Sequence, residues 1–565
     1  MISDSKMKFS NVCGTVLVLG DSISDQGQYV SWLNGWLAIT ERTDVQFVNA
    51  GVSSETCSGL SEPAHPFPRP CVLSRAQRAL ALVKPDWVLV SYGVNDAIYY
   101  PFASTRFEAY QRGIHALLAI IHAAGAKAIL ATPLVFDAPS FAGTLLPDGA
   151  DAPGETSRAY SYEQPYAHYD DVLARYAAWV LDDDGGAALA DMTADLRTPF
   201  LYDIAARRAA NAAYHSGDGI HPDVHGHFIV AKALLKTLFG VDTDALEALA
   251  GGTLFSLLYA RDQILHCYWK EYIGHDNPFK SEVPIDWEKQ VAVLNAKIAA
   301  YVQDKIDADG FVQHGTWEGF STETYFAASG YEVIVAKPQS DMPNNTLKNT
   351  ASKAPWVWRA EFFGAFPAVD LTLLRRGWHV AQLKICDRYG CPKAVTLMEA
   401  FRAELVKKYA LAPKAVLFGF SRGGLYAANY AARYPENVQC LYLDAPVVST
   451  ESWPGGKGIG VGGAPLEYRA CLAAYGAGYN DQERIAAVLA AILKAELPLL
   501  LVAGDADTVV PYSENGALLA DAYEKTNVPC KLLLKHDVGH HPHSVENPEE
   551  FGLTAFILAH SKAEK

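Results

Sequence analysis

Short runs of apolar, mostly β-branched residues alternate along the chain with longer segments in which apolar residues recur every three or four positions. In the first half the short runs lie at Thr15–Leu19, Val45–Val48, Trp87–Ser91 and Ala128–Ala131. Between the last two runs, residues 107–123 carry apolar side chains at helical spacing. Runs of this length predict buried strands, and their alternation with helices predicts a parallel sheet.

The same alternation restarts in the second half, with predicted strands at Trp378–Leu383, Ala415–Phe418, Val438–Leu443, Pro498–Val502 and Lys531–Leu534. The two halves share no sequence repeat, which favours two different α/β domains over a duplication. We therefore expect a first α/β domain over residues 1–240 and a second over residues 331–565. Residues 241–330 between them are expected to form a mainly helical connector.

Composition narrows the class of protein. The chain has 565 residues, enough for two to four domains at roughly 100–250 residues each. Its 63 acidic and 47 basic side chains give a net charge of −16, which argues against binding to nucleic acid or anionic membranes. The first twenty residues show no secretory signal. We expect a soluble protein, cytoplasmic, or periplasmic or secreted if a leader has been removed, and its oligomeric state stays open.

Nine cysteines are too few for a disulfide scaffold in a chain of this length. Cys57 and Cys71 flank one loop and could pair, and Cys386 and Cys391 form either a second loop pair or two free thiols. The histidine-rich segment 539–543 has no carboxylate or cysteine beside it at a familiar metal-ligand spacing. Glycine-rich nucleotide-binding loops are absent from the sequence as well, so no metal and no cofactor is expected.

A first group of polar residues follows the predicted strands of the first half. Ser22 ends the sequence Gly-Asp-Ser after the first strand, Gly51 follows the second, and Asn95 follows the third. Open α/β sheets place their sites at this carboxyl edge. Much later, Asp218 precedes His221 by three positions.

These residue types fit nucleophilic catalysis. A serine hydroxyl becomes a good nucleophile when a histidine takes its proton, and a carboxylate orients that histidine. The Gly51 N–H, the Ser22 N–H and the Asn95 amide could then stabilise the oxyanion. Each piece alone is weak, since an Asp-x-x-His pair is more often an ordinary loop hydrogen bond. The four pieces in this order favour a catalytic site.

On these four blocks, residues 12–240 resemble the SGNH (GDSL-type) hydrolases. The first block reads Asp-Ser-Ile where the family name has Asp-Ser-Leu. The resemblance implies a flavodoxin-like three-layer α/β/α domain, with Ser22 as nucleophile, His221 and Asp218 as the base pair, and Gly51 and Asn95 as oxyanion donors. It also implies cleavage of acyl esters, often of small acyl groups on sugars.

The loop between Cys57 and Cys71 is rich in proline, which restricts its backbone. It carries Glu62, His65 and Arg69. Either the loop is a rigid surface segment, or these three side chains contact substrate at the mouth of the site.

A second group begins where the predicted strand Ala415–Phe418 runs into Gly419-Phe-Ser421-Arg-Gly423 and then into a predicted helix. This context is typical of a nucleophile elbow, in which the serine sits on a tight strand-to-helix turn. Asp507 and His540 follow later, each after a predicted strand. The order Ser, Asp, His is the one that α/β-hydrolases use.

Residues 330–565 thus resemble the α/β-hydrolase superfamily, and the elbow is locally similar to that of glucuronoyl esterases. The resemblance implies Ser421 as nucleophile, Asp507 as the acid and His540 as the base. Asp505 and His541 compete for the last two roles, but the family's spacing favours Asp507 and His540.

Three further residues near this second group are candidates for oxyanion stabilisation or substrate binding. The backbone N–H of Arg422 is expected to be an oxyanion donor. Arg359 and Trp358 could contact substrate, although an arginine here could instead pair with local acids and a tryptophan is more often in the core.

Together these patterns predict a bifunctional serine esterase that removes short acyl groups, mainly acetyl, from carbohydrate esters. Its expected partner is an acylated carbohydrate rather than nucleic acid or a membrane. Two alternatives stay open: one domain is a silent binding module, or the C-terminal domain is a peptidase. Transfer of the acyl group to a sugar instead of water is also open.

Overall fold

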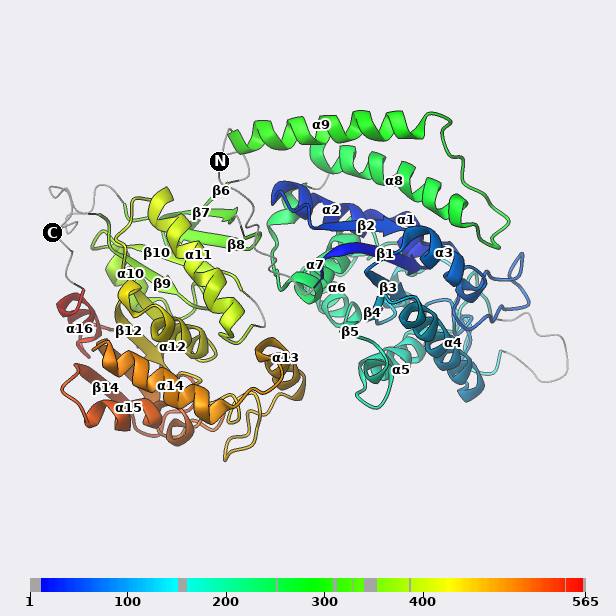
Figure 1. Cartoon of the computed structure of the whole chain (residues 1–565). Helices are drawn as coiled ribbons and strands as arrows, with labels where there is room; N and C mark the ends of the chain where they lie inside the picture. The colour runs from blue at the N-terminus through cyan, green and yellow to red at the C-terminus, as the bar shows by residue number, and fades with distance from the viewer. Residues whose placement is uncertain are drawn as a thin grey trace. The chain divides into compact units, whose positions relative to one another are not determined.

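The computed structural model describes residues 12–150, 160–249, 252–307, 312–327, 329–339, 353–385, 388–543 and 545–561. The chain divides into two compact units, residues 1–309 and 310–565, and each contains its own sheet (Figure 1). Within the described part of the chain, no helix combines the length and apolar character needed to cross a bilayer.

The first sheet has five parallel strands in the order β2-β1-β3-β4-β5. They are β1 (Gly14–Gly20), β2 (Val45–Asn49), β3 (Trp87–Ser91), β4 (Lys127–Ala131) and β5 (Met192–Ala194). The four predicted strands of this half are β1 to β4, and β5 was not predicted. Because the strand order reverses at β1, right-handed crossovers place the helices before and after β2 on opposite faces. This confirms the predicted three-layer α/β/α domain.

The helices of the first unit are α1 (Ser22–Gln26), α2 (Gln28–Ile39), α3 (Ala76–Val83), α4 (Ser104–Ala123), α5 (Tyr169–Leu181), α6 (Arg197–Ala210), α7 (Val224–Phe239), α8 (Thr253–Ile273) and α9 (Trp287–Asp307). Helices α2 and α7 contact each other, as do α3 and α4. In Figure 1, α8 and α9 lie side by side, and α8 also contacts α2 and β2.

Residues 241–330 do not form the separate connector that the sequence predicted. Helices α8 and α9 were correctly expected, but they belong to the first unit, which extends to residue 309. The reason is burial: Leu254 and Leu258 of α8 are at most 1% exposed, and the ring of Phe255 lies 4.5 Å from that of Trp32 in α2. The end of the segment supplies two strands to the second sheet instead.

The second sheet has nine strands in the order β14-β13-β12-β11-β9-β10-β8-β7-β6. They are β6 (Gln313–Trp317), β7 (Phe320–Phe326), β8 (Glu332–Ala336), β9 (Trp356–Arg359), β10 (His379–Leu383), β11 (Ala415–Phe420), β12 (Val438–Asp444), β13 (Leu499–Gly504) and β14 (Cys530–Lys535). Strands β6, β7, β8 and β10 pair antiparallel and the other pairs are parallel. This is an α/β-hydrolase-type domain, as predicted.

The helices of the second unit are α10 (Ala368–Leu374), α11 (Pro392–Lys408), α12 (Gly423–Arg433), α13 (Pro465–Tyr475), α14 (Asp481–Lys494), α15 (Gly516–Glu524) and α16 (Leu553–Ala559). The core of this unit lies on the central strands, where Val357, Val416 and Val502 are completely buried. Central parallel strands are covered on both faces, which explains why they read as continuous apolar runs in the sequence.

The suggested disulfide between Cys57 and Cys71 is not formed. Cys57 and Cys71 are both free thiols, and the Cys57 thiol lies 3.3 Å from a carboxylate oxygen of Asp96. Burial and this carboxylate raise the pKa of the Cys57 thiol well above its usual value. Cys391 is also free and buried, whereas its suggested partner Cys386 lies outside the described residues.

Candidate active sites

The first site lies where β1 ends. Ser22 is the first residue of α1, whose N-terminus is capped by the Asp21 side chain accepting from the Ile23 N–H. The Ser22 Oγ lies 2.8 Å from Nε2 of His221, and Nδ1 of His221 lies 2.8 Å from Oδ2 of Asp218. The structure thus brings together the three residues that the sequence predicted for general-base activation of a serine.

The charges around His221 favour its protonated form. Burial alone would lower the pKa of His221, but the hydrogen bond and charge of Asp218 outweigh it and raise the pKa. Burial would raise the pKa of Asp218, yet its bonds to His221 lower that pKa to about 2. Burial raises the pKa of Asp21 to about 7. A carboxylate and an imidazole held in this way suit a base that must accept a proton and stay oriented.

Asn49, for which the sequence suggested no role, links α1 to the loop after β2. Its Nδ2 donates to the Ser24 carbonyl of α1 (2.7 Å), and its Oδ1 accepts from the Gly51 N–H (3.0 Å). It therefore ties the helix that starts at Ser22 to the loop after β2. A polar residue ending an apolar strand was the only available signal.

The two predicted oxyanion donors of the first site differ in their surroundings. The Gly51 N–H is directed to Asn49, and a Cβ at Gly51 would lie 2.6 Å from the Ser24 carbonyl carbon, so only glycine fits against α1. The Asn95 side chain is oriented at both ends: its amide donates to the Glu55 carbonyl (3.2 Å) and its oxygen accepts from the Tyr99 hydroxyl (3.0 Å). Both oxyanion roles stay predictions.

The second site lies at the turn between β11 and α12. Ser421 has a φ of 47°, the left-handed region that non-glycine residues enter at a cost, as expected of a nucleophile elbow. Gly424 permits the turn to pack, because a Cβ there would lie 2.6 Å from the Pro446 side chain. The Ser421 Oγ lies 3.0 Å from Nε2 of His540, and Nδ1 of His540 lies 2.8 Å from Oδ2 of Asp507.

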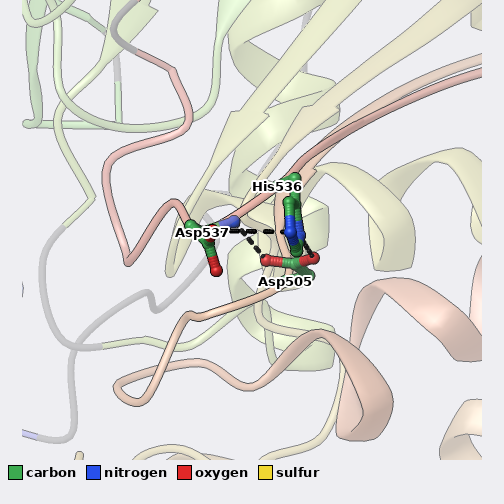
Figure 2. Close-up of side chains that lie close together, drawn as sticks. All are labelled: Asp505, His536 and Asp537. Atoms are coloured by element: carbon green, nitrogen blue, oxygen red, sulfur yellow. Dashed lines mark hydrogen bonds and ion pairs between the residues drawn. The ribbon is translucent and has the colours of Figure 1, made fainter.

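Geometry separates Asp507 from its neighbour Asp505. The Asp507 carboxylate is buried, and its second oxygen accepts from the N–H groups of Val509 and Val510 at 2.9 Å each. Asp505 instead faces His536, at 2.7 Å, and the Asp537 N–H, also at 2.7 Å (Figure 2). These three residues are exposed and bind one another, so they form a surface cluster apart from His540.

Glu62 and Arg69 are not placed to contact substrate, contrary to one prediction. The Arg69 guanidinium makes two hydrogen bonds of 2.6 Å to the Glu62 carboxylate, and both side chains are at most 2% exposed. Each charge is satisfied by the other, which holds the loop between Cys57 and Cys71. His65 is partly exposed and its Nδ1 donates to the Phe67 carbonyl (2.6 Å), so its predicted substrate contact stays a prediction.

The substrate contacts predicted for Trp358 and Arg359 at the second site are wrong as well, because both side chains are buried. Trp358 is 1% exposed and packs edge-on against Tyr430 in the core. Arg359, also 1% exposed, is paired with Asp370 through bonds of 2.8 and 2.6 Å. The guanidinium of Arg422 is paired with Glu361 at 2.8 and 2.9 Å, while the oxyanion role of its backbone N–H stays a prediction.

Comparison with protein families matches each half separately. Residues 18–229 match the model of the GDSL-like lipase/acylhydrolase family, and residues 389–562 match that of the prolyl oligopeptidase family. Each matched region contains one complete Ser-His-Asp group. No curated protein matches the chain.

Solved structures resemble part of the chain at low identity. An S-formylglutathione hydrolase from Agrobacterium tumefaciens is 15% identical and covers 44% of this chain and 99% of its own, with a TM-score of 0.34. Est1E from Butyrivibrio proteoclasticus is 17% identical over 44% of this chain and 98% of its own, with a TM-score of 0.30. A puromycin-hydrolyzing peptidase of Mycobacterium tuberculosis is 14% identical, and the match covers 45% of this chain and 40% of the peptidase, with a TM-score of 0.33.

The pair of His221 and Asp218 predicts the pH dependence of the first site. The base must be neutral to accept the serine proton, so activity falls as the pH drops through the raised pKa of His221. In Asp218→Asn the pKa of His221 decreases, which shifts this acid limb to lower pH, and the rate falls by on the order of 10⁴-fold. The measurement is kcat/KM against pH for an aryl acetate in a Ser421→Ala background. An acid limb unmoved by Asp218→Asn contradicts the assignment.

For the second site, Asp507→Asn and Asp505→Asn form a matched pair two residues apart. We expect Asp507→Asn to lower kcat by on the order of 10⁴-fold, because His540 loses the carboxylate that orients it. Asp505→Asn should leave kcat close to that of the parent, since Asp505 binds His536 at the surface. Aryl ester hydrolysis in a Ser22→Ala background measures both. Equal losses in the two variants would show that the assignment is wrong.

Proposed function

Because the chain joins a GDSL-like domain to an α/β-hydrolase-type domain, we propose that this two-domain hydrolase is a bifunctional serine esterase acting on acylated carbohydrates. It removes short acyl groups, chiefly acetyl, through acyl-enzyme intermediates at Ser22 and Ser421. The observation that carries the proposal is that both serines lie within hydrogen-bond distance of a histidine whose other nitrogen binds an aspartate.

The two sites run the same sequence of steps. His221 or His540 accepts the hydroxyl proton as the serine oxygen attacks the ester carbonyl, and the aspartate stabilises the imidazolium that forms. The histidine then returns the proton to the departing sugar oxygen, leaving an acyl-serine. Water, deprotonated by the same histidine, hydrolyses that ester and releases the carboxylic acid.

Four aromatic side chains near the first site support a carbohydrate substrate; we call His65, Phe67, Tyr162 and Phe279 the aromatic cluster. Phe67 lies 4.5 Å from His65 and 5.6 Å from Phe279, and His65 lies 5.4 Å from Tyr162, between ring centres. Phe279 is 73% exposed. The exposed ring of Phe279, flanked by the three partly buried rings, offers flat apolar area on which the C–H face of a sugar ring can stack.

Hydrogen bonds place the aromatic cluster beside the loop after β2. The Asn277 amide donates to the Ser53 carbonyl (2.9 Å), two residues beyond Gly51, and its oxygen accepts from the Phe279 N–H (2.9 Å). A sugar bound on the aromatic cluster would therefore lie close to the loop that carries a predicted oxyanion donor.

Charge at the second site supports a neutral sugar ester rather than a uronic acid ester. Because the elbow is locally similar to that of glucuronoyl esterases, Arg422 is the side chain that could bind the carboxylate of a uronic acid ester. Its guanidinium is bound by Glu361 at 2.8 Å and approached by Glu467 at 3.3 Å, so its charge is already compensated. A substrate carboxylate would have to compete with two protein carboxylates for it.

A peptidase activity of the second domain is the competing candidate, because residues 389–562 match the prolyl oligopeptidase family. The same triad attacks an amide as well as an ester. The esterase and peptidase candidates therefore share the same catalytic residues, and only the substrate that is cleaved distinguishes them.

Acetate release from acetylated polysaccharides tests the proposal, using the wild type, Ser22→Ala, Ser421→Ala and the double variant. We expect each single variant to keep the activity of the other site and the double variant to lose on the order of 10⁶-fold. A single variant without any activity would show that the other domain is silent. Cleavage of a prolyl anilide by Ser22→Ala, without acetate release, would assign the second domain as a peptidase.

A further inference from the structure

Helix α8 carries a polar stripe on a face that is turned toward the first site. Its members are Tyr259, Gln263, His266 and Lys270, and we call them the α8 stripe. Their spacing of four, three and four residues places them on one side of a helix. All four lie beyond residue 229, where the match to the GDSL-like family ends.

The first two members of the stripe bind the end of α1. The Gln26 carbonyl, at the last residue of α1, accepts from Gln263 Nε2 (2.9 Å) and from the Tyr259 hydroxyl (3.3 Å). The last carbonyls of a helix have no partner within it, and α1 is only five residues long. Helix α8 therefore supplies hydrogen-bond donors to the short helix that begins with Ser22.

The other two members bind a carboxylate within α1. His266 Nε2 and Lys270 Nζ each lie 2.7 Å from Oδ1 of Asp25. The other oxygen, Oδ2, accepts from the Ser53 N–H (3.1 Å) and from the Ser53 hydroxyl. Although burial would raise the pKa of Asp25, the hydrogen bonds and charges of His266 and Lys270 hold that pKa well below its usual range. The carboxylate thus joins α8, α1 and the loop after β2.

His266 also contacts the end of β2 directly, because its Nδ1 lies 3.1 Å from the Asn49 carbonyl. The imidazole therefore contacts both the Asp25 carboxylate of α1 and the main chain at the end of β2. Asn49 in turn binds the Ser24 carbonyl and the Gly51 N–H.

We propose that His266 and Lys270 are positioning residues of the first active site. Acting through Asp25 and Asn49, they hold the start of α1, with Ser22, in register with the loop that carries Gly51. The GDSL-like domain is thereby completed by a helix outside its matched region. This inference rests on the proposed esterase function of Ser22.

The same helix offers a matched control. Asp262, also on α8 and buried, accepts from the Ser31 hydroxyl (2.8 Å) and from the Asn34 amide (3.0 Å), both in α2. It anchors α8 to α2 and not to α1. If α8 contributes only stability, Asp262→Asn and the stripe variants should have similar effects.

The test measures kcat and KM for an aryl acetate in the full-length Ser421→Ala protein. We expect His266→Gln and Lys270→Met to lower kcat by on the order of 10- to 100-fold with KM little changed, because small displacements of reacting groups are costly. Lys270→Arg, which keeps the charge, should recover most of kcat, and Asp262→Asn should match the parent. Equal kcat in Lys270→Met, Asp262→Asn and the parent overturns the proposal.

Amide hydrogen exchange gives a readout that requires no substrate. The peptide covering residues 20–27 should exchange faster in His266→Gln and Lys270→Met than in Asp262→Asn, at comparable melting temperatures. Unchanged exchange of this peptide overturns the positioning role. If the Ser421→Ala parent hydrolyses no ester, the proposed function of Ser22 fails, while the exchange data still decide whether the α8 stripe holds α1.

Discussion

A serine hydroxyl and the histidine that activates it must lie within one hydrogen bond of each other, and this requirement shapes both units. The partners are far apart in sequence: 199 positions separate Ser22 from His221, and 119 separate Ser421 from His540. Parallel strands bring such residues together because their carboxyl ends meet at one edge of the sheet. Each unit therefore builds its site on the turns and loops that leave this edge.

Buried charge pairs hold those loops in place. Beside the first site, Arg75 binds both oxygens of Glu55 and also donates to the Ala50 carbonyl, next to Gly51, at 2.8 Å. In the second unit, Arg359 binds Asp370 and also donates to the Ala365 carbonyl, in the loop after β9, at 2.9 Å. Removing one partner of a fully buried pair costs about 3–5 kcal/mol, so such pairs tolerate little rearrangement. They give the loops a fixed geometry that loose surface segments would lack.

The sequence predicted the parts of the molecule whose signals are local. Strands β1 to β4 and β10 to β14 were recognised from the sequence, whereas β9, at the centre of the second sheet, was not. Both triads were recognisable because Ser22, Ser421 and His540 each sit in a short motif after a strand, and His221 belongs to the short motif Asp-x-x-His. The antiparallel strands β6 to β8 were missed, since they are amphipathic or lie next to glycine-rich turns. Helix α8 was predicted as a helix, but its packing onto the first unit was not. The buried leucines that hold it there could occur in a helix packed against any domain, so they did not reveal its partner.

Charged side chains were the hardest to predict, because their type does not reveal their partner. Glu62, Arg69 and Arg359 were as compatible with a substrate contact as with an internal ion pair, and the structure shows internal pairs. The contact between Asp25 and Lys270 spans 245 positions, and no local pattern links two residues so far apart. Such contacts follow from the packing of complete elements.

We propose that one chain carries two independently activated serines. Intact-mass spectrometry after treatment with a fluorophosphonate, followed by peptide mapping, measures this directly, since the reagent modifies a serine that a neighbouring histidine has made nucleophilic. We expect two adducts per chain, at Ser22 and Ser421, and we expect His221→Ala to abolish only the adduct at Ser22. A chain that takes up one adduct or none, or that is modified at other serines, would contradict it.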